Sequence, residues 1–150
     1  MPAPKCSSMI LHPAVVVHGM EDVRLALRPG RPVLLLSAAG AALFAGCGFW
    51  HALIRLANQE FPAAAVQNAL DCADAAGMAL AAIRIGLRTL VLYADAPGFA
   101  SVAAIADQQG VRLLTSRPPA LDLSVRGAAR RLESWLTAPD PNIDSAARLR

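Results

Sequence analysis

The sequence is poor in aromatic residues and in lysine. Aromatic side chains make up 5% of the 150 residues, so a folded core has to be built mostly from alanine, valine, leucine and isoleucine. Lys5 is the only lysine, and arginine supplies the rest of the 14 basic residues. Because 55% of the residues are hydrophobic and 17% are charged, the composition is far from that of disordered chains. A chain of this length typically forms one domain that buries roughly 68–70% of its unfolded surface.

Cysteine is also scarce. Cys6, Cys47 and Cys72 are the only three, and no pair of them has CxxC spacing. An odd number without this spacing argues against a disulfide framework and against a structural zinc site. We therefore expect no bound metal ion and a reducing, cytoplasmic location. The arginine- and alanine-rich composition is typical of bacterial proteins from GC-rich genomes.

The sequence lacks the basic stripe interleaved with aromatic residues that is usual in nucleic-acid-binding proteins. The net charge is +3, but most arginines stand singly near expected turns. Only Arg126, Arg130 and Arg131 are grouped, and their spacing places them on the outer face of one helix. We expect no nucleic-acid partner.

Familiar catalytic and cofactor motifs are missing as well. There is no G-x-G-x-x-G, no G-x-x-x-x-G-K-[ST] and no G-x-S-x-G in the chain. The usual dinucleotide and phosphate cradles and the nucleophile elbow of hydrolases are therefore absent. The sequence leaves the cofactor unknown and does not decide whether the protein is an enzyme.

One long run has no charged residue. Residues 32–54 contain no Asp, Glu, Lys or Arg, and a run of this length is sufficient to span a bilayer. However, a turn-like segment at residues 37–40 and Gly46-Cys47-Gly48 interrupt the run, and arginines flank both of its ends. We therefore favour a protein without a membrane span, and keep a small membrane-associated protein as an alternative.

The remaining pattern alternates between short β-branched or aliphatic runs and longer helical ones. We expect strands near residues 15–17, 33–36, 64–72, 89–93 and 111–115, with helices between them and a last helix at 125–136. Residues 64–72 are the least certain, because their alanines also suit a helix. Such alternation predicts an α/β fold with a parallel sheet of about five strands and helices on both faces, in the flavodoxin-like order 2-1-3-4-5. A piece of a β/α barrel is the second interpretation. We expect one domain over residues 1–137 and a flexible tail at 138–150.

Ligands of open α/β sheets bind at the carboxyl ends of the strands. In the favoured order a crevice lies between the first and third strands, where His18 and Asp71 would face each other. We expect Arg117 and the segment 46–48 to lie at opposite edges of the sheet. The strand-end residues that we consider ligand-binding candidates are His18, Ser37, Asp71, Tyr93, Asp95, Thr115 and Arg117.

These residues predict a domain that binds a small polar molecule at the carboxyl edge. The alternative is a non-catalytic assembly protein, because turns also collect polar residues for purely local reasons. We also expect Cys72 not to be a nucleophile, since the neighbouring Asp71 and Asp74 oppose thiolate formation.

The expected helix at 75–85 is apolar almost all round, with Arg84 as its only charge. A helix on a sheet normally keeps a polar outer side. We therefore expect this protein to form a homodimer or a higher homo-oligomer through this helix.

Overall fold

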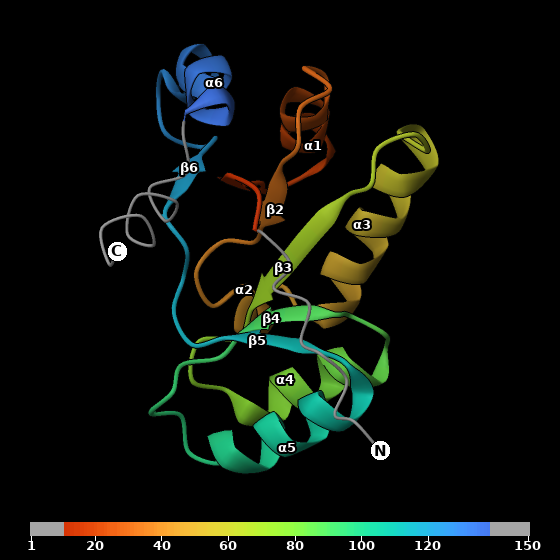
Figure 1. Ribbon diagram of the computed structural model, residues 1–150, viewed down its shortest axis with the longest axis vertical. Helices are drawn as coiled ribbons and strands as arrows, with labels where there is room; N and C mark the ends of the chain where they lie inside the picture. The colour runs from red at the N-terminus through yellow and green to blue at the C-terminus, as the bar shows by residue number, and fades with distance from the viewer. Residues whose placement is uncertain (1–10, 139–150) are drawn as a thin grey trace, which may run out of the picture.

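The computed structural model describes residues 11–138 and contains one parallel sheet with helices packed against it (Figure 1). The α/β class predicted from the sequence is confirmed. The strands are β1 (Ala14–Val16), β2 (Leu34–Leu36), β3 (Gln67–Asp71), β4 (Thr89–Val91), β5 (Arg112–Leu114) and β6 (Ala120–Asp122). The helices are α1 (Met20–Leu27), α2 (Ala41–Phe44), α3 (Cys47–Glu60), α4 (Ala76–Arg84), α5 (Phe99–Gln109) and α6 (Ala128–Thr137). Apart from Ala138, the tail expected at 138–150 lies outside the described residues.

The strand order is β5-β4-β3-β2-β1-β6, so the predicted order 2-1-3-4-5 is wrong. β2 lies between β1 and β3, pairing Leu35 with Val15 on one side and with Asn68 on the other. Local patterns do not distinguish these orders, because each strand has the same apolar run in either arrangement. From β1 to β5 the strands are added one after another in the same direction. The sheet twists strongly along this path, from the steep β2 to the nearly horizontal β4 and β5 in Figure 1.

The helices gather on one face of the sheet, not on both faces as predicted. Alternate strand residues such as Val15, Leu35 and Leu90 join buried side chains of the helices in the main core. The opposite face holds a smaller cluster around Val16, Leu36 and Val91, to which none of the described helices contributes. The reason is topological, since right-handed crossovers that all step in one direction place their helices on the same side.

The arrangement resembles part of a β/α barrel, which was the second interpretation of the sequence. In such barrels, strands that follow each other in the sequence are neighbours in the sheet, and the helices all lie on one face. β6 pairs with β1, as the last strand of a barrel does with the first. However, β5 and β6 are not hydrogen-bonded to each other and form the two edges of an open sheet.

β6 is the strand that sequence reasoning missed. It is three residues long, follows Pro118 and Pro119, and has only Leu121 as a buried side chain. The interpretation of residues 64–72 as a strand is confirmed, although β3 begins at Gln67. The helix-to-strand joints at Gly86 and Gly110 are confirmed too, and both glycines have the positive φ that ends a helix without steric cost.

The uncharged run 32–54 is divided among β2, α2 and α3. Within residues 11–138, no helix combines the length and the apolar character that crossing a membrane requires. In α3 the core-facing side chains are Trp50, Leu53, Ile54 and Ala57. Phe49 and Leu56 of the same helix are exposed.

Candidate functional site

A buried polar cluster lies at the carboxyl ends of β2 and β3. Asp71 ends β3 and its side chain is 0% exposed, while Ser37 directly follows β2 and is also buried. Arg117 Nη1 donates to Asp71 Oδ2 at 2.6 Å and to the Ser37 carbonyl at 3.1 Å. Ser37 Oγ accepts the backbone N–H of Asp71 at 2.9 Å. Three of the predicted candidates therefore do come together.

The position of Arg117 corrects the expectation that it lies far from the end of the second strand. Arg117 belongs to the connection between β5 and β6, which runs from one edge of the sheet to the other. On this path its side chain reaches β2 and β3, where it neutralises the charge of Asp71. Asp71 Oδ1 also accepts the N–H of Ala73, a residue with φ +50. Each oxygen of the carboxylate therefore has a hydrogen-bond partner within the protein.

A second, more open cluster lies at the carboxyl ends of β1 and β6. His18 Nε2 is 2.8 Å from Asp122 Oδ1, and the two side chains are 38% and 39% exposed. Asp122 Oδ1 also accepts the backbone N–H and the hydroxyl of Ser124. The backbone N–H of His18 donates to Asp22 Oδ2. His18 therefore pairs with Asp122 and not with Asp71, because β2 separates the first strand from the third.

The His18–Asp122 pair fixes the hydrogen on the imidazole ring. An ionised carboxylate only accepts hydrogen bonds, so Nε2 carries the hydrogen and Nδ1 of the neutral ring is an acceptor. Within the described residues, Nδ1 has no hydrogen-bond partner. The cluster is not a serine-hydrolase triad, since Ser124 donates to the carboxylate and not to the imidazole.

Asp122 has a lowered pKa. Its partial burial raises the pKa, but the hydrogen bonds from His18 and from Ser124 together outweigh this effect. We expect His18→Ala to raise the pKa of Asp122 toward the ordinary carboxyl value of about 4. Carboxyl chemical shifts followed by NMR from acid to neutral pH measure this change. Identical titration curves for the two proteins would contradict the assignment of His18 as a partner.

The sign of the pH dependence follows from the direction of this shift. A carboxyl group whose pKa is lower in the folded chain adds stability above the pKa of the unfolded chain. It loses that contribution as the pH falls through the folded value. We therefore expect the stability difference between wild type and His18→Ala to disappear in strong acid, as thermal unfolding at a series of pH values will show.

The other predicted candidates lie at the same edge but outside these two clusters. Tyr93 follows β4, packs against the smaller core cluster and donates its backbone N–H to the carbonyl of Ala73. Asp95 and Thr115 are exposed and form no side-chain hydrogen bond within residues 11–138. The structure thus brings Tyr93 near the turn after β3 and leaves the other two at the surface.

Cys72 is fully buried directly after β3. Burial, followed by the negative charge of Asp71 and then by Cys47, raises the pKa of Cys72 to about 12. A thiol with this pKa has only about one thiolate in 10⁵ molecules at neutral pH. We expect iodoacetamide to leave Cys72 unmodified in the native protein at pH 7 and to modify it once the chain is unfolded. Rapid native labelling of Cys72, read by peptide mass spectrometry, would refute this.

Sequence reasoning missed Asp122 and Ser124. The alternation Ala120-Leu121-Asp122-Leu123 is the only signal of a strand there, and it is too short to separate from a loop. In the part of the chain that the structure describes, no group of three or more His, Cys, Asp or Glu side chains is arranged to hold a metal ion.

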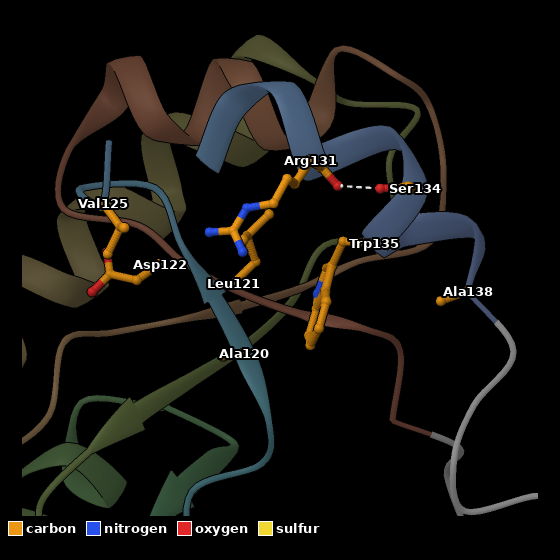
Figure 2. Close-up of a pocket in the computed structure, with 8 residues that line it drawn as sticks. All are labelled: Ala120, Leu121, Asp122, Val125, Arg131, Ser134, Trp135 and Ala138. Atoms are coloured by element: carbon orange, nitrogen blue, oxygen red, sulfur yellow. Dashed lines mark hydrogen bonds between the residues drawn. The ribbon is translucent and has the colours of Figure 1, made fainter. Parts of the chain in front are cut away.

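A hollow of about 390 Å³ lies beside β6 and extends from the second cluster along the side of α6 that carries Arg131, Ser134 and Trp135. Figure 2 shows Arg131 and Trp135 reaching from α6 toward β6, with Asp122 and Val125 at the opposite end. Its lining residues are Ala120, Leu121, Asp122, Val125, Arg131, Ser134, Trp135 and Ala138. The carboxyl edge therefore combines a satisfied buried ion pair, an accessible histidine–carboxylate pair and an adjoining hollow.

No family model matches this chain, and no curated protein matches it closely enough to be a relative.

Proposed function

We propose that this domain binds a small polar molecule at the carboxyl edge of the sheet, beside His18 and Asp122. The observation that carries the proposal is the 2.8 Å contact between these two side chains, which are 104 residues apart in the sequence. An exposed pair of this kind adds little to stability, so folding alone gives a weak reason for it. The edge is also where ligands of parallel α/β sheets bind.

The chemistry of the site favours a ligand with hydroxyl or amino groups. Nδ1 of the neutral His18 ring is able to accept a hydrogen bond from a ligand, and Asp122 Oδ2 and the nearby Asp22 carboxylate are acceptors as well. Arg117, the cation among the strand-end candidates, is already paired with Asp71. Immediately beside His18 and Asp122 the free groups are acceptors, so a donor-rich polar ligand fits these two side chains better than a phosphate or a carboxylate.

A thermal-shift screen tests the proposal. The panel contains polyols, sugars and amino alcohols, together with carboxylates and phosphates of similar size. Specific binding at one hundred times the Kd stabilises a protein by about 2.7 kcal/mol, which raises the Tm by several degrees. We expect a donor-rich compound to do so with the wild type and not with His18→Ala.

His12→Ala is the matched control, because His12 precedes β1 and lies at the opposite end of the same strand. It should keep the response to the compound. The proposal fails if no member of the panel raises the Tm, or if His18→Ala and His12→Ala respond alike.

Self-association is a second proposal, with an observation of its own. Leu43, Phe44 and Phe49 are 57%, 72% and 50% exposed, an unusual concentration of apolar surface at α2 and the start of α3. In α4 and the residue that follows it, a segment that the sequence favoured as the interface, Met78 and Ile85 are the large exposed apolar residues. A homodimer or higher oligomer would cover these side chains. Light scattering at micromolar concentration tests this, and a monodisperse mass near 15.7 kDa would rule it out.

A further inference from the structure

The hollow between β6 and α6 has the form of a groove along a free sheet edge. Its one wall is the strand β6, and its other wall is made by Arg131, Ser134 and Trp135 of α6 (Figure 2). β6 pairs only with β1, so its outer side carries no neighbouring strand within the described part of the chain. Unlike the pair His18–Asp122, most of this groove has no role in the function proposed above.

On the outer side of β6, several backbone groups have no hydrogen-bond partner among residues 11–138. The N–H of Leu123 donates to the carbonyl of Val16, so Leu121 and Leu123 direct their backbone groups toward β1. Because these groups alternate along a strand, those of Ala120 and Asp122 point away from β1. The carbonyl of Asp122 is taken by the N–H of Val125. Within the described part of the chain, the N–H and the carbonyl of Ala120 and the N–H of Asp122 are thus left for an added strand.

The groove is lined by one cation, Arg131, and one carboxylate, Asp122, and two further arginines, Arg126 and Arg130, stand next to the lining residues Val125 and Arg131 in the sequence. The side chains of Arg126, Arg130 and Arg131 form no hydrogen bond or ion pair with any other residue between 11 and 138. Glu133, the only acidic residue of α6, is paired with Arg31 at 2.8 Å. Asp122, the only acidic lining residue, lies at the end of the groove away from Trp135 (Figure 2), where its Oδ1 accepts from His18 and Ser124.

The side chains of the groove suit a ligand that has both apolar and negatively charged groups. Leu121, Val125 and the Trp135 ring supply apolar surface, and Arg131 lies between them with its guanidinium toward β6 in Figure 2. The Trp135 indole N–H donates to the carbonyl of Ala14 at 2.8 Å, which holds the ring in place as a wall. An extended chain with alternating apolar and acidic residues would meet both kinds of surface.

We propose that the β6–α6 groove binds an extended acidic peptide segment of a partner protein, which adds to the sheet as a strand beside β6. Backbone hydrogen bonds to Ala120 and Asp122 give the affinity, and a carboxylate on Arg131 gives the selectivity. This is the physical pattern of peptide recognition by strand addition.

An NMR titration of the isotope-labelled full-length protein tests the proposal. The probe is a short peptide of alternating glutamate and valine, blocked at both ends. We expect saturable shifts of the Ala120 and Asp122 amides and of the Trp135 indole N–H. The indole of Trp50 serves as an internal control, because it is buried against Asn68 and should not move.

Three matched comparisons separate the parts of the proposal. Arg131→Gln should weaken binding about tenfold, the cost of one charge-assisted hydrogen bond. Arg84→Gln, which removes an exposed arginine on α4, should leave binding unchanged. A peptide with lysine in place of glutamate, and one with N-methylated backbone amides on the side facing β6, should both bind at least about tenfold more weakly.

Other outcomes would overturn the proposal. If the lysine peptide binds as tightly as the glutamate peptide, the groove does not select acidic residues. If the methylated peptide binds as tightly, the peptide does not add to the sheet as a strand. If the same signals shift on concentrating the protein alone, a second copy occupies the groove. The failure of this proposal leaves the small-molecule site untouched, because His18→Ala and Arg131→Gln are read in separate experiments.

Discussion

Arg117→Met is expected to lower the free energy of unfolding by about 3 kcal/mol, the lower end of the cost of removing one partner from a buried ion pair, because Asp71 is fully buried and the Arg117 side chain is 24% exposed. The substitution keeps most of the side-chain volume but leaves the fully buried Asp71 without its cation. It also removes a donor from the Ser37 carbonyl. For a domain of this size the Tm should fall on the order of 10 °C, as calorimetry or circular dichroism will measure.

Two further variants show that the effect comes from the buried charge. Arg84→Met removes an exposed arginine and should change stability by less than about 0.5 kcal/mol. The double variant Asp71→Asn/Arg117→Met should be more stable than Arg117→Met alone, because no unpaired charge remains and the amide oxygen of the introduced asparagine can still accept the N–H of Ala73. A double variant as unstable as the single one would show that packing, and not charge, causes the loss.

Ala79→Glu is expected to abolish folding, whereas Met78→Glu on the same helix should leave the fold intact. Ala79 is 0% exposed and faces the sheet, so a glutamate there is buried without a partner and collides with the core. Met78 is partly exposed on the outer side of α4. The yield of soluble protein and its circular dichroism spectrum should separate the two variants clearly.

Met78→Glu also tests self-association. If α4 forms the contact between copies, this variant should be a folded monomer. If the contact is instead the exposed surface at α2 and the start of α3, Phe44→Glu should be the folded monomer. A soluble, folded Ala79→Glu variant would contradict the packing described above. Substitutions at the buried face of α4 cannot locate an interface, since they act on the core first.

The apolar character of α4 illustrates how a local pattern has more than one cause. Sequence reasoning attributed it to contact with a second copy. In the structure α4 packs on the sheet and is flanked by α3 on one side and α5 on the other. Neighbouring helices of the same chain therefore cover much of its surface, and the need for a partner copy rests on the smaller set of exposed residues. The neighbours of a helix depend on strand order, which the helix's own sequence does not encode.

The composition and the alternation of short apolar runs with helical segments determined the α/β class and most element positions. They also determined that Ser37, Asp71 and Arg117 lie at the carboxyl edge, because every parallel strand directs the residue after it to the same side. Only the tertiary structure decided the strand order, and with it the partners of those residues. Strand order depends on which edges pair across long stretches of chain, and a local pattern is compatible with several pairings. β6 is the clearest case, since three residues with a single buried side chain become a strand only because the free edge of β1 is there to pair with them. Asp122 meets His18 for that reason, through a contact that no local pattern in the sequence reveals.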